Sequence, residues 1–358
     1  MNTTVESILN IAGFFGGAFI LSLVINRFLL KFAQSLGIRH STDVKVRWSN
    51  ESRPALGGVS FYICFLIGFM FYAIYFGQSD VFGNPQLLGL FFGITLAFLL
   101  GLSDDAYDTR PKIKLLAQIL CGVILITTDS EIRLFDQLWL NYTFTVLWVV
   151  GIMNSINMLD NMDGITTVTS ISIILAILGI SIPFSMVDNV NLFLMITTLG
   201  ALAGFLIYNW NPSKIFMGDT GSMFLGFFLA FFSIRYLWNN GIDEGSYSIF
   251  SNLTLVLITF ALPIIDTTYV VIKRVRKGQS PMIGGKDHST HMLSYKGMSD
   301  AQVAWTFSIL GVISALLALN VAKYIPIDSL ALVLIWIYFV VLLTSVFLLG
   351  KKENKSDQ

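Results

Sequence analysis

Residues 330–349 read LALVLIWIYFVVLLTSVFLL, an apolar stretch without a charged side chain. A helix needs about 20 such residues to cross the roughly 30 Å hydrocarbon core of a bilayer, so this stretch is long enough to span a membrane. Ten similar runs precede it, at residues 8–30, 57–76, 87–102, 115–127, 138–156, 165–184, 192–208, 223–238, 249–272 and 303–324. Each run is continuous rather than alternating, which indicates helices and not a β-barrel.

The composition extends this pattern to the whole chain. Of the 358 residues, 55% are hydrophobic and 12% charged, against about 25% charged in soluble domains, and the mean hydropathy is +0.73. We predict an all-α, polytopic membrane protein with one transmembrane domain over residues 1–358, and eleven helices, or ten if run 115–127 does not cross. Lys and Arg together number 22, as do Asp and Glu, so net charge gives no indication of a nucleic-acid partner.

The distribution of basic residues predicts the orientation. If the N-terminus lies outside, every Lys and Arg except Arg133, Arg235 and Lys323 falls on the inner side, as the positive-inside rule requires. The C-terminus is then cytoplasmic, and residues 273–300 form a large cytoplasmic loop. Because the inner loops also carry all three histidines, we expect an active site on the cytoplasmic face.

Acidic residues gather at the inner ends of three predicted helices. The sequences are GLSDDAYD at 101–108, NMLDNMDG at 157–164 and FMGDTGSMFLG at 216–226. Carboxylates near a bilayer are costly and repel one another, so this grouping needs a counter-charge. Oxygen donors without nearby cysteine favour Mg²⁺, with Mn²⁺ as the alternative, and therefore phosphoryl chemistry. Taken singly, each Asp could instead be a helix cap or a solvated loop end.

The third of these sequences has the features of an anion and base site. Residues 218–222 open a helix with small side chains, which let backbone N–H groups approach an anion. Asn209 and Phe216 supply an amide and a ring, which can pair with and stack on a base. The alternatives are an ordinary turn and, for Phe216, packing at the membrane interface.

Two of the three histidines, His288 and His291, lie in GGKDHSTHML at 284–293. Their i, i+3 spacing places both on one face if the segment is helical. A zinc site would need a third nitrogen or sulfur ligand, and none accompanies them in the sequence. We interpret the pair as cationic donors to a phosphate or sugar hydroxyl, with a solvated loop as the alternative.

With these motifs in this order, the chain resembles the polyprenyl-phosphate N-acetylhexosamine-1-phosphate transferases, glycosyltransferase family 4, from residue 53 to residue 293. The resemblance implies that a membrane polyprenyl phosphate attacks the β-phosphate of a UDP-N-acetylhexosamine, giving a polyprenyl-diphospho-sugar and UMP with Mg²⁺. Short loops without extra domains suit a bacterial enzyme, which we expect in the inner membrane in contact with the lipid bilayer, and its product would begin a cell-surface glycan such as lipopolysaccharide. A homodimer is left open.

The chain is more similar to the undecaprenyl-phosphate N-acetylglucosamine-1-phosphate transferases than to the phospho-N-acetylmuramoyl-pentapeptide transferases, which are the alternative. The latter carry a lysine where this chain has Asp108, and adjacent histidines where it has the spaced His288 and His291. Another departure is Asn161, where many members have glycine. Asn tolerates the positive φ of a tight turn better than other non-glycine residues.

The resemblance implies a role for each matching residue. Asp219 would be the main Mg²⁺ ligand, and Asp104 and Asp105 would handle the lipid phosphate or complete the metal site. The other matches are substrate-binding or catalytic: Asn157, Asp160 and Asp163 at the nucleotide diphosphate, Asn209 and Phe216 at the uracil, His288 and His291 at phosphate or sugar, and Arg53, Lys112 and Lys114 as cations for the nucleotide and diphosphate.

Eleven helices also describe secondary transporters, in which an intramembrane acid can couple transport to protons. No inverted repeat is visible in the sequence, and the acids lie at inner helix ends. Asp266, in PIID at 263–266, comes nearest to the membrane interior, yet it also lies near the inner end of its run. We therefore favour the transferase.

Overall fold

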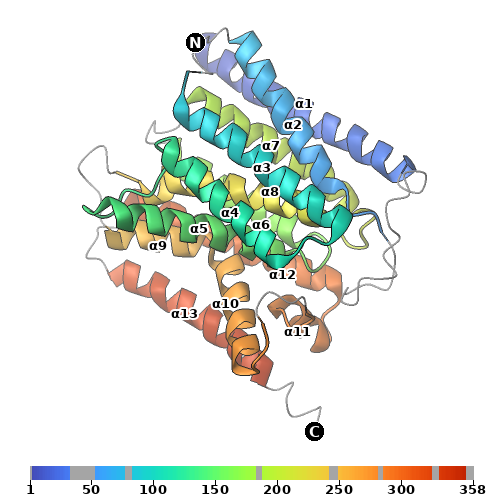
Figure 1. Ribbon diagram of the computed structural model, residues 1–358, viewed down its shortest axis with the longest axis vertical. Coiled ribbons are helices and arrows are strands. Elements are labelled where there is room, and N and C mark those ends of the chain that lie inside the picture. The colour runs from blue at the N-terminus through green and yellow to red at the C-terminus, as the bar shows by residue number, and fades with distance from the viewer. Residues whose placement is uncertain are drawn as a thin grey trace.

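The structure, a computed structural model, describes residues 2–32, 53–76, 83–182, 188–241, 249–280, 285–324 and 330–351. These residues form a bundle of helices (Figure 1) and one isolated β-bridge, between Ala55 and Phe216. The elements in chain order, with one π-helical turn labelled η2, are α1 (Asn2–Phe32), α2 (Gly57–Tyr75), α3 (Pro85–Tyr107), α4 (Pro111–Thr127), α5 (Leu138–Leu159), α6 (Ile165–Ser181), α7 (Asn189–Asn209), α8 (Gly218–Ser233), η2 (Ile234–Trp238), α9 (Ile249–Thr259), α10 (Ala261–Arg276), α11 (Ser289–Tyr295), α12 (Asp300–Tyr324) and α13 (Leu330–Lys351). The predicted all-α fold of a polytopic membrane protein is confirmed.

The lengths of the helices fit membrane spans for most of the predicted runs. Within the described residues, eight helices are long and apolar enough to cross a bilayer, and the bent pair α9–α10 would be a ninth. The helices of runs 115–127 and 165–184, α4 and α6, have 17 residues each and are slightly shorter. Each predicted run is mostly helical in its described residues, but the number of spans stays a prediction.

One predicted span, run 249–272, is not a continuous helix. α9 ends at Thr259, α10 begins at Ala261, and the two axes differ by 81°. Pro263 gives a physical reason, because proline has no N–H to donate to the carbonyl of Thr259 and is tolerated only in the first turn of a helix. Beyond the break, α10 runs beside α13 and α11 near the C-terminal end of the molecule (Figure 1).

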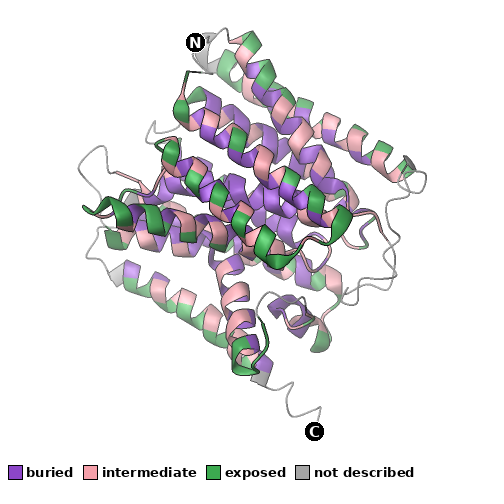
Figure 2. Cartoon of the chain, viewed as in Figure 1, coloured by how far each residue is buried: buried purple, intermediate pink, exposed green. Residues whose placement is uncertain are grey.

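α8 forms the centre of the bundle. In its span, which continues through η2, 94% of the most apolar stretch is buried, and Figure 2 shows the buried residues concentrated there. Two neighbouring helices approach its start through glycines. A Cβ at Gly101 of α3 would lie 2.3 Å from the carbonyl oxygen of Asp219, and one at Gly58 of α2 would lie 2.1 Å from the nitrogen of Gly221. α2 and α3 can therefore pack this closely against the start of α8 only because glycine stands at positions 58 and 101.

The peripheral helices α1 and α13 contrast with α8. Only 17% and 11% of their apolar stretches are buried. Large apolar side chains such as Leu9 and Leu348 are 65% and 63% exposed. An apolar surface this extensive fits contact with lipid rather than with water.

Candidate active site

Asp219 is the second residue of α8, directly after a left-handed turn. Gly218 has a φ of +74°, which side chains disfavour. A Cβ there would also lie 2.7 Å from the carbonyl oxygen of Ala55 and from Oδ2 of Asp105. Glycine is therefore required at 218 for both the turn and the close approach. The turn places the Asp219 carboxylate at the positive end of the helix dipole.

Asp105, near the end of α3, caps α8 from outside. Its Oδ1 accepts the N–H of Asp219 at 3.0 Å, and its Oδ2 accepts the N–H and the hydroxyl of Thr220 at 2.9 and 2.6 Å. The first N–H groups of a helix have no partner within the helix, and a carboxylate is well suited to accept them. The contacts of Asp105 are those of a support for Asp219, and its role at the lipid phosphate or the metal site stays a prediction.

Asp104, Lys114 and Asp219 form a charged cluster between α3, α4 and α8. The Lys114 ammonium pairs with Oδ2 of Asp104 and lies 3.4 Å from Oδ2 of Asp219. The side chains of Asp104, Lys114 and Asp219 are 5%, 25% and 32% exposed, so Asp219 is the most accessible of the three. Two carboxylates here share one ammonium, which leaves an excess of negative charge.

Asn157, in the last turn of α5, fixes the other oxygen of Asp219. Its Nδ2 donates to Oδ1 of Asp219 and to Oγ of Ser222, both at 2.9 Å. Asp219 is thus held by a lysine on one oxygen and an amide on the other. The structure therefore brings together four of the predicted site residues, Asp104, Lys114, Asn157 and Asp219, from four different helices.

Asp163 organises a second part of the site, in the loop between α5 and α6. It accepts hydrogen bonds from Arg53 Nη1 at 3.2 Å, from the N–H of Ser213 at 2.9 Å, from Ser213 Oγ at 2.8 Å and from Asn211 Nδ2 at 3.1 Å. Its side chain is 10% exposed, and that of Arg53 is 14% exposed. Asp163 thus joins three chain segments and holds Arg53, whose guanidinium lies 5.6 Å from the centroid of the Phe216 ring.

Asn209 is buried and bonds to the loop that leads to Phe216. It is 3% exposed, its Oδ1 accepts the hydroxyl of Thr167 at 2.8 Å, and its Nδ2 donates to the carbonyl oxygen of Ile215 at 3.1 Å. The Phe216 backbone is fixed by a bond from its own N–H to the Pro54 carbonyl, at 2.9 Å. The contacts of Asn209 are those of a support for this loop, whereas the half-buried Phe216 keeps a ring that a base could stack on.

The histidine segment meets both the α5–α6 loop and α10. Thr290 Oγ1 lies 2.5 Å from Oδ1 of Asn161, and the His288 and His291 rings pack edge to face with centroids 5.5 Å apart. Sequence reasoning considered Asp266 only as a transport acid, but its carboxylate lies 2.9 Å from Nδ1 of His288. The sequence signal for this pair was the acidic residue Asp266 in the apolar run that precedes the histidines.

Two expectations about this segment are corrected by the structure. Burial, and secondarily the neighbouring His288, lower the pKa of His291 to about 4, so His291 is neutral near pH 7 and is not the cationic donor we predicted. Asn161 is not among the residues with positive φ, and the left-handed residue of this loop is Gly164, with a φ of +75°. The exchange of Gly for Asn at 161 therefore costs no backbone strain and supplies the side chain that contacts Thr290.

The remaining predicted site residues lie at the edge of this region. Asp160 is the half-buried residue that follows α5. Lys112 is exposed on the first turn of α4, and Asp108 is exposed with a φ of +51° where α3 ends. The predicted loop 273–300 contains the end of α10 and all of α11, while its residues 281–284 lie outside the described residues.

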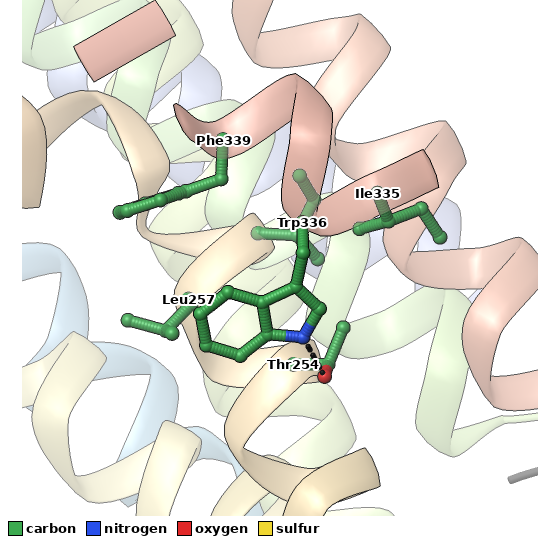
Figure 3. A pocket seen from close by; sticks show the side chains of 6 residues that line it. Thr254, Leu257, Ile335, Trp336 and Phe339 are labelled. Carbon is green, nitrogen blue, oxygen red and sulfur yellow. Dashed lines mark hydrogen bonds between the residues drawn. The ribbon is translucent and has the colours of Figure 1, made fainter. Parts of the chain in front are cut away.

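A shallow apolar hollow between α9 and α13 differs from this region in chemistry. Figure 3 shows the indole Nε1 of Trp336 donating to Oγ1 of Thr254, at 3.0 Å. The lining side chains are Thr254, Leu257, Ile258, Ile335, Trp336 and Phe339. Because none of them is titratable, this hollow offers no acid, base or cation for catalysis.

Comparisons with known proteins match this chain over most of its length. The family model "Glycosyl transferase family 4" matches residues 87–237. A probable undecaprenyl-phosphate N-acetylglucosaminyl 1-phosphate transferase of Bacillus subtilis (strain 168) is 28% identical over 346 residues, covering 92% of this chain and 91% of the relative. A phospho-N-acetylmuramoyl-pentapeptide-transferase of Streptococcus agalactiae serotype Ia is 32% identical over 61% of this chain and 70% of the relative, and one of Staphylococcus saprophyticus is 30% identical over 81% and 90%.

Proposed function

The chain belongs to glycosyl transferase family 4, and we propose that it transfers N-acetylglucosamine 1-phosphate from UDP-N-acetylglucosamine to undecaprenyl phosphate. The products are undecaprenyl-diphospho-N-acetylglucosamine and UMP. The observation that carries this proposal is the carboxylate cluster at the start of α8, because its excess negative charge needs a cation and a phosphate-bearing substrate brings one. The similarity to the Bacillus subtilis protein, over nine-tenths of both chains, supports the choice of substrates.

The residues at this cluster fit a magnesium ion. Asp219 would hold it, with Asp104 close by, and substrate oxygens and water would complete the shell, since Mg²⁺ usually takes one or two protein carboxylates. Within the described residues no group of three or more His, Cys, Asp or Glu is placed to hold a metal. The ion would neutralise charge on the donor diphosphate as the bond to UMP breaks.

The side chains around the cluster would orient the two substrates. The acceptor phosphate oxygen attacks the β-phosphorus of the donor, and UMP leaves from the opposite side. Lys114, between Asp104 and Asp219, would draw the acceptor phosphate to the donor. Arg53 and Phe216, which pack together, would hold the nucleotide. Asp104 would act by electrostatic positioning, because a phosphate monoester with a second pKa of about 6 is already mostly ionised at pH 7.

The orientation and location form part of the same proposal. The chain is a multi-pass membrane protein whose relatives described above are bacterial. The donor is a soluble cytoplasmic nucleotide, so the start of α8 would face the cytoplasm, with the N-terminus outside and the C-terminus inside. The positive-inside distribution of Lys and Arg supports this orientation.

The test is transfer by the purified protein in detergent with undecaprenyl phosphate and Mg²⁺. Radiolabel from the sugar of UDP-N-acetylglucosamine should enter an organic-extractable lipid, and UMP should form in equal amount. Undecaprenol without its phosphate is the matched control and should accept nothing. If the protein used only UDP-N-acetylmuramoyl-pentapeptide as donor, it would have the activity named for the 32% and 30% identical relatives. If it used no UDP-sugar at all, the proposed sugar-phosphate transfer would be wrong.

A further inference from the structure

α10 holds the start of the histidine segment through one buried carboxylate. Oδ2 of Asp266 lies 2.9 Å from Nδ1 of His288, and its Oδ1 accepts the N–H and the hydroxyl of Ser289 at 2.7 and 2.5 Å. Asp266 is 1% exposed and His288 is 5% exposed. A buried carboxylate needs such partners, because an unpaired buried charge is very costly.

The hydrogen-bonding roles in this contact follow from chemistry. An ionised carboxylate can only accept hydrogen bonds, so Nδ1 of His288 carries the proton and donates it. The ring nitrogen left for other partners is Nε2.

A second contact from the same helix secures the preceding residue. The Arg274 guanidinium makes a two-pronged ion pair with Asp287, with Nη2–Oδ1 at 2.6 Å and Nε–Oδ2 at 3.1 Å, and Arg274 is 4% exposed. This pair anchors the segment at the residue before His288. The Thr290–Asn161 contact then joins the segment to the loop that follows Asn157, so α10 fixes where His288 lies relative to the candidate active site.

We propose that Asp266 is a positioning residue, which orients the ring of His288 and keeps a proton on Nδ1, so that Nε2 is presented to the substrate. The proposal rests on the proposed function for its substrate and extends it to a residue in no sequence motif of the site. Asp266→Asn tests it, because the amide can still accept from Ser289 but offers NH₂ to His288. Nδ1 must then become an acceptor, and the neighbouring charge is lost.

The kinetic test is a double-substitution cycle. We expect Asp266→Asn to lower kcat about tenfold or more and to change the KM for UDP-N-acetylglucosamine less than about twofold. In a His288→Gln background the same change should alter kcat less than about twofold, because the residue through which it acts is gone. Asp266→Glu, which keeps the charge, should lie between wild type and Asp266→Asn, and it stands in if the Asn variant does not fold.

Asp287→Asn is the matched control, since it removes the neighbouring anchor but leaves the Asp266–His288 contact. Its effect should be the same in the wild-type and His288→Gln backgrounds. An equal loss from Asp266→Asn in both backgrounds would reduce Asp266 to a structural anchor and overturn the proposal.

A labelling experiment separates this proposal from the proposed function, because it requires no transfer. Diethyl pyrocarbonate modifies unprotonated imidazole nitrogen, and peptide mass spectrometry reports its rate at His288. We expect equal labelling in wild type and Asp287→Asn, through Nε2, and slower labelling in Asp266→Asn, in which the unprotonated nitrogen is the enclosed Nδ1. Equal rates in wild type and Asp266→Asn would contradict the positioning role, whatever substrate the protein uses.

Discussion

The two ends of α8 both gather charged side chains from several helices, but they balance the charges differently. At the C-terminal end, Arg235 of η2 pairs with Asp188 at 3.0 Å and also bonds to Gln86. Beside it Arg133 pairs with Glu131 at 3.1 Å. Within the described part of the chain, Arg235 and Arg133 thus each have a carboxylate partner of their own.

At the N-terminal end, Asp104 and Asp219 share Lys114. Hydrogen bonds stabilise the two carboxylates: Asn157 donates to Asp219, and the N–H of Thr109 donates to Asp104. A fold that needed only to be stable would gain from matched charges at both ends, because adjacent like charges are destabilising. The comparison supports our proposal that the N-terminal end of α8 holds a cation and its phosphate ligand.

The largest effect should come from the most accessible carboxylate, Asp219. Asp219→Asn keeps the size of the side chain and removes its charge, so transfer should fall about 10³-fold if the cation loses its main ligand. The rate of lipid-linked sugar formation at saturating Mg²⁺ measures it. A rate within about tenfold of wild type would remove Asp219 from the proposed ligands and weaken the contrast between the two ends.

A smaller loss, about 10²-fold, is expected for Asp104→Asn, which leaves Asp219 in place but changes how Lys114 is held. Because the acceptor phosphate is already ionised near pH 7, raising the pH should not restore the rate. The pH profile of the variant checks this. Recovery to near wild-type rates at about pH 9 would show instead that Asp104 is a general base.

Phe216→Ala tests whether nucleotide binding is separate from the chemistry at the carboxylate cluster. If the ring stacks on uracil, its loss should weaken donor binding by about 1–3 kcal/mol, seen mainly as a raised KM for the UDP-sugar. Phe216→Tyr, which keeps an aromatic ring, is the matched control and should bind nearly as wild type. A normal KM with a depressed kcat in the Ala variant would place the uracil elsewhere.

The smallest effect belongs to the balanced end. Arg235→Gln removes the ion pair with Asp188, a partly exposed contact that contributes about 1 kcal/mol or less. The thermal midpoint in detergent should fall by a few degrees at most, and transfer should stay within about twofold of wild type. A large loss of transfer with an unchanged midpoint would give this end a role in the reaction that our account does not assign.

Local sequence patterns predicted those parts of the protein that depend on local chemistry. Apolar runs predicted the helices, and the grouping of acids predicted Asp104 and Asp219. The roles of Asp163 and Asn209 depend on partners that the sequence does not place beside them, such as Arg53, 110 residues from Asp163. A resemblance implies that a residue is important, but it does not distinguish a ligand from the side chain that supports it.

The break between α9 and α10 was missed for a similar reason. Hydropathy does not change across residues 249–272, so the run reads as one span, although Pro263 was a visible signal for a new helix start. The break matters because α10 carries both Asp266 and Arg274 to the histidine segment. The pairing of Asp266 with His288 could be suspected from the sequence, but its geometry required the fold.

The central claim, that the unbalanced end of α8 holds the cation used for transfer, is tested most directly by the Mg²⁺ dependence of the reaction. Transfer from UDP-N-acetylglucosamine should be measured across Mg²⁺ concentrations for wild type, Asp219→Asn and Arg235→Gln. The account predicts that EDTA abolishes wild-type transfer and Mg²⁺ restores it, that Asp219→Asn needs more Mg²⁺ and reaches a far lower plateau, and that the Arg235→Gln curve coincides with wild type. Undiminished wild-type transfer in EDTA would contradict it.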